Sequence, residues 1–475
     1  MLEGLRSARL RMRNGRPLVI AAMALLIANT LGVVALLASD RLAVIDAIVL
    51  AAAPWALLAA AFRPDWLLLA LIGMPASFTT MIQTSRLTML VAVALVALLV
   101  TRGRLSLGLG TGLAALILLD VAGHLFLAQV GQDAIAVNQA AMSSLTYYVL
   151  LALLAFNLAV LGEMDGDRLG AALVIGVLST LVVGLAGFGN AWFESGPGII
   201  THTYLAYMVA AALGVTLARL FMTEDVANRR PGDFLLTGVL LSLVVPSAVR
   251  AAWIAVVITF TILAFRSGRL RYALVVMVVI FLALLSPTAR QEVSRSESGD
   301  IVAQFETGEI TTGRWELWTA LWEQAESSLP WGNGFGYMWS LSSEDLVGSP
   351  GGFGSEQSGV VPPHNDFIYL LVEFGIPGLL LLVFFWVQLF RAFIQVTQAA
   401  DRLSRRSGWL LLGVLVTGLM VALFDDLFSV RPFAERFFPV AGFVFGLAQV
   451  VRARRERMMP TSVHQPVPTP SLTLP

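Results

Sequence analysis

Residues 362–390 read PPHNDFIYLLVEFGIPGLLLLVFFWVQLF. Two prolines close the preceding segment, and Asn365 or Asp366 can cap the helix that follows. The apolar run after them is long enough to cross a bilayer, which requires about 20 residues. This stretch therefore predicts a transmembrane helix with His364 at its mouth, where water and the membrane meet.

The rest of the chain repeats the apolar pattern. Of the 475 residues, 57% are hydrophobic and only 13% are charged, whereas charged residues make up about a quarter of an ordinary soluble domain. We expect an all-α polytopic membrane protein with 12 to 14 transmembrane helices, because several of the candidate spans are short. The candidates are 18–38, 43–62, 66–82, 87–101, 106–130, 143–162, 169–190, 199–222, 234–248, 250–265, 270–286, 366–390, 408–428 and 434–452.

These spans divide the chain into four parts. Residues 1–286 hold about 11 spans, and residues 366–452 hold about three. Between them lies a large, partly helical loop, 287–365, and a tail at 453–475, rich in proline, serine and threonine, is predicted to be disordered.

All 31 basic residues are arginines, and their distribution predicts the orientation. With the N-terminus inside, 23 arginines fall in cytoplasmic segments and 8 fall outside. The positive-inside rule then places both termini and the tail in the cytoplasm and the 287–365 loop in the periplasm.

The 287–365 loop is acidic. It carries 11 carboxylates against three arginines, so nucleic acid is an unfavourable partner for it. Apolar and aromatic residues recur at helical spacing from Thr311 to Ser328, which predicts an amphipathic helix lying against the membrane face.

Several polar residues within the spans have two interpretations. Asp120 and His124 lie four residues apart, as in a proton relay or in a buried hydrogen-bonded pair. Asp425, Asp426 and Glu373 are similarly open between helix packing and a direct role. With no cysteine in the chain and no convincing third ligand beside Asp120 and His124, we predict no metal site.

Three motifs carry a resemblance to a known family. Residues 313–318 read GRWELW, residues 330–336 read PWGNGFG, and His-Asn-Asp-Phe at 364–367 precedes EFGIPG at 373–378. In order and spacing these motifs resemble the shared domain of bacterial O-antigen ligases and polysaccharide polymerases.

The resemblance implies an electropositive site at the periplasmic face. It identifies His364 as the catalytic residue and Arg250 and Arg314 as the residues that bind the donor diphosphate. Arginine suits this task because its guanidinium binds phosphate oxygens in bidentate geometry and stays protonated.

One departure from the family pattern affects the second phosphate contact. Many relatives carry an arginine shortly before the helix that begins near residue 200, but residues 194–206 contain none. Arg314, Arg431 or Arg436 is left to replace it, and Asn365 and Asp366 are possible supporting residues.

The resemblance also implies the reaction and its partners. It predicts an inverting, metal-independent transferase without cofactors in the bacterial inner membrane, which moves a glycan from undecaprenyl diphosphate to lipid A-core at the periplasmic face. The predicted partners are this donor, a lipid A-core or glycan acceptor, and membrane lipid. An O-antigen or exopolysaccharide polymerase and a protein O-oligosaccharyltransferase share the motifs, and a transporter or flippase would need inverted repeats, which the sequence does not show.

Overall fold

The structure, a computed structural model, describes residues 63–76, 84–103, 105–125, 132–185, 202–222, 231–244, 249–268, 314–340, 364–428 and 431–458. The predicted spans 18–38, 43–62 and 270–286 lie outside these residues, as do most of the 287–365 loop and the tail after residue 458. The number of 12 to 14 spans therefore stays a prediction.

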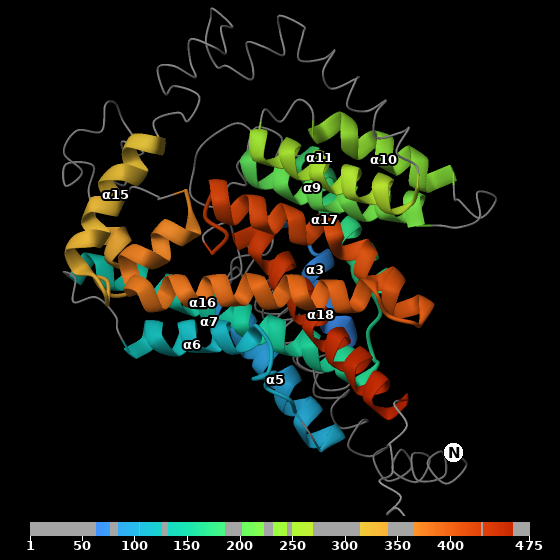
Figure 1. The fold of residues 1–475 in the computed structure, drawn as a ribbon, viewed down its shortest axis with the longest axis horizontal. Coiled ribbons are helices and arrows are strands. Elements are labelled where there is room, and N and C mark those ends of the chain that lie inside the picture. Colours follow the sequence, from blue (N-terminus) through green and yellow to red (C-terminus); the bar gives the residue numbers. More distant parts are fainter. Residues whose placement is uncertain are drawn as a thin grey trace, which may run out of the picture.

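The described residues form helices and no β-strand (Figure 1). Seven of these helices are long and apolar enough to cross a membrane, which confirms the all-α polytopic class. The helices are α3 (Pro64–Gly73), α5 (Thr84–Arg102), α6 (Leu113–Leu125), α7 (Gln132–Leu161), α8 (Gly166–Leu185), α9 (His202–Met222), α10 (Pro231–Val244), α11 (Arg250–Arg266), α15 (Arg314–Ser328), the short 3₁₀-helix η5 (Tyr337–Ser340), α16 (Asp366–Thr397), α17 (Arg402–Phe424) and α18 (Arg431–Met458).

Helix α18 occupies the centre of the bundle. It packs along α7 and also contacts α16 and α17 (Figure 1). Aromatic side chains fill the contact: Phe433, Phe437 and Phe438 are fully buried, and the ring of Phe438 stacks on that of Tyr148 at 5.1 Å between centroids. This packing makes α18 the scaffold for the elements around it.

Several helix ends differ from the predicted spans, and two of them bear on the site and the cavity described below. The span expected at 106–130 begins as a helix only at Leu113, because residues 108–111 form a turn in which the Thr111 amide and hydroxyl both donate to the Gly108 carbonyl. Helix α18 continues to Met458, six residues beyond the expected span. Its last turns are rich in arginine, whose long side chains can reach water from a helix end.

Helix α16 is broken in the middle. Gly375 has a positive φ of 63°, and Pro377 lacks the amide that would bond the carbonyl of Glu373. The Pro330–Gly336 segment replaces the lost bonds: Gly334 N–H donates to the Glu373 carbonyl at 2.8 Å, and Ile376 N–H donates to the Pro330 carbonyl at 2.9 Å. The glycine-rich segment is thereby joined to α16 through its backbone.

The break fixes the position of α15. This helix forms where an amphipathic helix was predicted, but its buried residues Leu317, Leu321 and Ala325 belong to the protein core, and the helix packs against α16. Trp322 points away from the core, with 54% of its surface exposed. The aliphatic side of α15, which was expected to lie on the membrane face, therefore packs on protein at one end of α16 (Figure 1).

We predict that Gly375→Ala destabilises the protein by at least about 2 kcal/mol, because a methyl group would overlap the Pro330 carbonyl and strain the positive φ. Gly238→Ala in α10 is the matched control, since no described atom outside its own stretch of helix lies within 4 Å of the added carbon. Thermal unfolding in detergent measures both variants. Equal melting temperatures for the two would contradict the proposed backbone joint.

Candidate active site

His364 stands just before α16 and faces the end of α17. Its Nδ1 lies 3.2 Å from Oδ1 of Asp425. The His364 side chain is 31% exposed and that of Asp425 only 9%. Because the aspartate occupies Nδ1, the neutral ring has its lone pair on Nε2 when Nδ1 carries the proton. The pair has the arrangement of a base and a residue that orients it.

The backbone of His364 is unusual and is held by its neighbours. Its φ of 50° is the one positive value among the described non-glycine residues, a conformation that few non-glycine residues adopt. Asn365 caps α16 by accepting from the amides of Phe367 and Ile368, and it donates to the Leu423 carbonyl at 3.1 Å.

Asp366 adds a further bond between α16 and the segment after α17. Its side chain is fully buried, and its Oδ2 accepts from Leu427 N–H at 3.1 Å. The two predicted supporting residues, Asn365 and Asp366, therefore lie at the site and tie the start of α16 to the end of α17.

Asp426 is the third buried carboxylate here. It accepts from the backbone amides of His364 and Asn365, and its Oδ1 has no hydrogen-bond partner among the described residues. Burial raises the pKa of Asp426 to about 7, against the opposing effects of His364 and the two amides. This carboxyl group therefore titrates near neutral pH.

His364, Asp425 and Asp426 together offer a possible cation site, although we predicted none. One ligand atom from each lies within 4.8 Å of the others. However, Oδ1 of Asp425 already contacts the imidazole and accepts from Asp426 N–H at 3.0 Å. The same three side chains therefore fit two arrangements, a hydrogen-bonded acid–base group and a cation site.

Arg250 opens α11 at the same end of the bundle. Helix α11 packs against α17, and the Arg266 guanidinium lies 5.8 Å from the centre of the Trp409 ring. Arg250 precedes Arg266 by sixteen residues, and Asp425 follows Trp409 by sixteen residues. Because α11 and α17 pack together and the chain runs away from this contact by the same number of residues, Arg250 and Asp425 lie toward the same end of the two helices.

The other predicted arginines differ in their placement. Arg314 is the first residue of α15, and its side chain lies outside the described atoms. Arg431 begins α18 and pairs with Glu435 at 2.8 Å. Arg436 is buried, and its guanidinium donates to the carbonyls of Pro432 and Met74, which favours a structural role.

Two other polar groups show packing contacts. Oδ1 of Asp120 accepts from the Thr146 hydroxyl at 2.8 Å, and His124 Nδ1 lies 2.8 Å from the backbone carbonyl of Asp120. The His124 side chain is 53% exposed, so the two residues do not form the buried pair that was one of the two interpretations. Glu373 is fully buried beside the break in α16 and accepts from Met338 N–H at 3.3 Å.

The sequence did not identify Asp425 as the partner of His364. The two residues are 61 positions apart, and the contact exists only because α16 and α17 meet at this end. One feature of the sequence could have indicated this partner: Asp425 and Asp426 stand near the end of the 408–428 span, on the predicted side of the membrane where His364 was expected.

The site lies mainly on elements with a recognisable family signature. Residues 234–383 match the O-antigen ligase family. The matched O-antigen ligase domain covers α11, α15 and the first half of α16, and it contains Arg250, Arg314 and His364. Asp425 and Asp426 lie outside the matched residues. No curated protein matches the chain.

We predict that Asp426→Asn gains stability relative to the wild type as pH rises. With a folded pKa of about 7 against an ordinary 3.8, the folded protein holds a proton here that the unfolded chain releases. The free energy of unfolding of the wild type is therefore unaffected by this group below about pH 4, falls as the pH rises from about 4 to about 7, and is constant above that. Melting temperatures at about pH 5 and pH 8 test this; a constant difference between the two proteins would contradict it.

Proposed function

We propose that this membrane protein is a glycosyltransferase of the O-antigen ligase type, which transfers a glycan from undecaprenyl diphosphate to lipid A-core at the periplasmic face. The family match of residues 234–383 supports the class. The observation that carries the chemical proposal is the 3.2 Å contact between His364 and Asp425 at the partly exposed mouth of α16.

In the proposed reaction, His364 acts as the general base. An acceptor hydroxyl attacks the anomeric carbon while its proton passes to Nε2 of His364. The bond from that carbon to the diphosphate breaks, and the electron pair leaves with the phosphate oxygen. Attack from the face opposite the diphosphate inverts the anomeric configuration.

Asp425 positions the base and stabilises the charge that it acquires. Its carboxylate favours the tautomer with the proton on Nδ1, so that Nε2 can accept. After transfer, the imidazolium lies beside a carboxylate that is 91% shielded from water, where the attraction is stronger than in solvent. In this scheme, His364 and the buried carboxylates of Asp366, Asp425 and Asp426 need no metal.

The donor diphosphate is assigned to Arg250 and Arg314. The leaving group gains negative charge as the glycosidic bond breaks, so cations at this end of the bundle stabilise the transition state. Arg250 is suited to this role because it begins α11, a neighbour of α17, toward the end where α17 reaches Asp425. Arg431 is a possible further contact at the start of α18.

We predict that His364→Ala lowers turnover by about 10²–10⁴-fold while the protein stays folded and binds donor. Asp425→Asn should lower turnover and change its pH profile, because the neutral amide no longer stabilises the imidazolium. Transfer in reconstituted vesicles with a lipid-linked donor measures both. Asp120→Asn, which removes a carboxylate bonded to Thr146, is the matched control and should retain turnover.

Near-normal turnover by His364→Ala would exclude it as the base, and loss of donor binding would reassign it to diphosphate recognition. Treatment with a chelator should leave wild-type transfer unchanged; a loss restored by a divalent cation would favour the metal alternative at His364, Asp425 and Asp426. Offering lipid A-core and lipid-linked repeats as competing acceptors distinguishes ligase from polymerase.

We also predict that Arg250→Lys weakens transfer by about tenfold or more, although the charge is kept, because one ammonium cannot reproduce two hydrogen bonds to phosphate. Arg266→Lys at the other end of the same helix is the control, since a lysine can still lie over the Trp409 ring. Wild-type transfer by Arg250→Lys at equal protein level, with unchanged donor affinity, would remove Arg250 from the site.

A further inference from the structure

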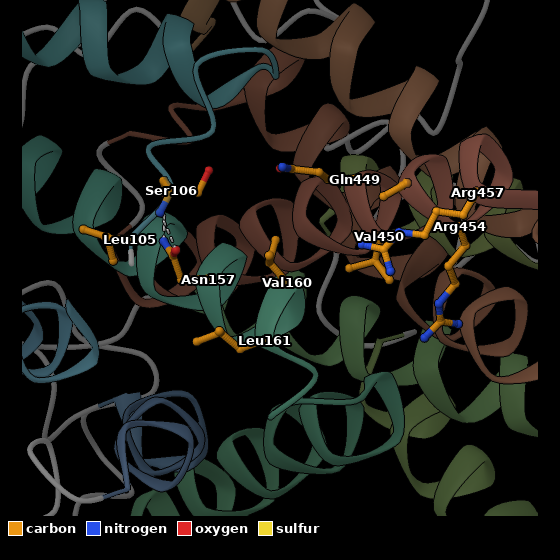
Figure 2. Close-up of a pocket in the computed structure, with 10 residues that line it drawn as sticks. Leu105, Ser106, Asn157, Val160, Leu161, Gln449, Val450, Arg454 and Arg457 are labelled. Carbon is orange, nitrogen blue, oxygen red and sulfur yellow. Dashed lines mark hydrogen bonds between the residues drawn. The ribbon is translucent and has the colours of Figure 1, made fainter. Parts of the chain in front are cut away.

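A cavity of about 400 Å³ opens at the opposite end of the bundle, between the last turns of α7 and α18 (Figure 2). Its apolar lining includes Val160, Leu161 and Val450, and its polar lining includes Arg454 and Arg457. Ligand-binding pockets typically range from about 300 to 1,000 Å³. The cavity is therefore large enough for a headgroup with an attached apolar segment.

One wall of the cavity is held rigidly by Asn157. This side chain is only 3% exposed and accepts from Ser106 N–H at 2.8 Å. Its amide donates to the carbonyls of Ser106 at 2.9 Å and Leu153 at 2.8 Å. All of its hydrogen-bonding groups are used to fix the 105–106 backbone against α7, so the pocket is formed in the absence of a ligand (Figure 2).

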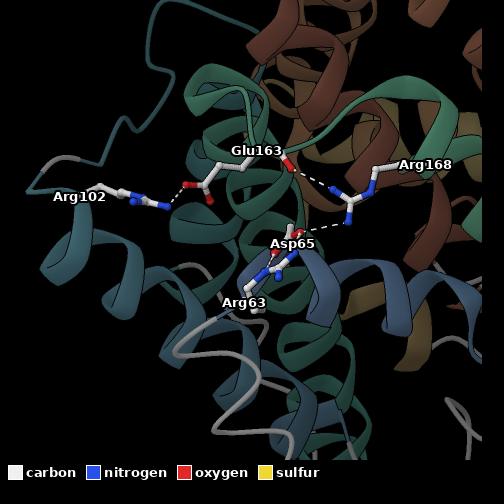
Figure 3. Close-up of polar contacts among 5 residues, drawn as sticks. All are labelled: Arg63, Asp65, Arg102, Glu163 and Arg168. Atoms are coloured by element: carbon white, nitrogen blue, oxygen red, sulfur yellow. Dashed lines mark hydrogen bonds and ion pairs between the residues drawn. The ribbon is translucent and has the colours of Figure 1, made fainter. Parts of the chain in front are cut away.

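Three other arginines at this end pair with two carboxylates. Arg102 pairs with Glu163, and Asp65 pairs with both Arg63 at 3.0 Å and Arg168 at 3.2 Å (Figure 3). These three arginines are among those that the sequence assigns to the cytoplasmic side.

The two arginines of the cavity have one carboxylate partner among the described residues. Arg457 is exposed and forms no ion pair with any described residue. Arg454 contacts Asp401 at 3.3 Å, but 55% of its side chain remains exposed. Two guanidiniums and one carboxylate leave an excess of positive charge beside an apolar wall, at the end of the bundle that the arginine distribution predicts to be cytoplasmic.

We propose that this cavity binds an anionic phospholipid of the cytoplasmic leaflet. The guanidiniums of Arg454 and Arg457 bind the phosphate, for which their planar donors are well matched. The apolar wall formed by Val160, Leu161 and Val450 contacts the glycerol and the first acyl carbons. A free phosphate ion would use the arginines alone, whereas a lipid uses both parts of the cavity. Basic pockets between helices on the cytoplasmic side are suited to such headgroups.

The test compares lipid retention by the purified full chain in detergent. Native mass spectrometry with equal amounts of phosphatidylglycerol and phosphatidylcholine should show preferential retention of phosphatidylglycerol. The double variant Arg454→Gln/Arg457→Gln should lose about thirtyfold in this retention, as expected for two arginines near an anionic headgroup.

Arg452→Gln/Arg455→Gln is the matched control. It removes the same charge from the same turns of α18, but these guanidiniums contact Gln395 and Gln398 of the α16 end instead of lining the cavity. Retention by this control should stay close to that of the wild type. An equal loss in both double variants would reduce the effect to general surface charge and overturn the proposed site.

The apolar wall is tested separately. Val160→Trp fills the cavity while both arginines remain, and it should also lower phosphatidylglycerol retention; Val450→Phe, on the facing helix, serves if the first variant melts early. Unchanged retention by a folded wall variant would overturn the proposal. Binding of inorganic phosphate by the wild type together with equal retention of phosphatidylglycerol and phosphatidylcholine would identify a free-phosphate site and overturn the lipid proposal.

Discussion

The proposed site depends on the hydrogen bonds that hold the start of α16 against the end of α17. Three adjacent residues take part: His364 contacts Asp425, Asn365 donates to the Leu423 carbonyl, and Asp366 accepts from Leu427 N–H. A positive φ at a histidine is unfavourable and persists only where surrounding bonds over-determine it. Here the bonds of Asn365 and Asp366 hold the backbone on one side, and Asp425 holds the ring on the other. The side chain is thus preorganised before any substrate arrives.

The break in α16 joins the glycine-rich segment 330–336 to the half of the helix that begins beside His364. A continuous helix would satisfy its own carbonyls and would offer no backbone group to a neighbour. Because Pro377 and Gly375 interrupt the hydrogen-bond ladder, the carbonyls of Val372 and Glu373 accept from Asn333 and Gly334. The glycine-rich segment therefore acts as a structural joint and not as a phosphate-binding loop. Through this joint, the element that begins with Arg314 is connected to the helix that begins beside His364.

Hydropathy was sufficient to predict the membrane class and the seven long apolar helices of the described residues, since the bilayer imposes the same length requirement on each helix. The orientation inferred from the arginine distribution stays a prediction. The mouth position of His364 also followed from the sequence, because prolines and a capping residue mark a helix start locally. The late start of α6 was missed, since a turn within residues 108–111 leaves the apolar composition unchanged. Asp425 and Arg436 could not be assigned, because their roles depend on partners at His364 and Met74 that are distant in sequence.

The distribution of charge around His364 restricts how two substrates could approach it. Asp366, Asp425 and Asp426 are buried together on the side of α16 and α17, and this group disfavours a diphosphate in direct contact with it. Arg250 belongs to α11, which packs against α17 and begins toward the same end of the bundle. In the proposed reaction, the diphosphate therefore lies toward Arg250 and the neutral acceptor sugar lies toward the carboxylates. Such an arrangement separates the leaving group from the proton acceptor, as attack from the opposite face of the anomeric carbon requires.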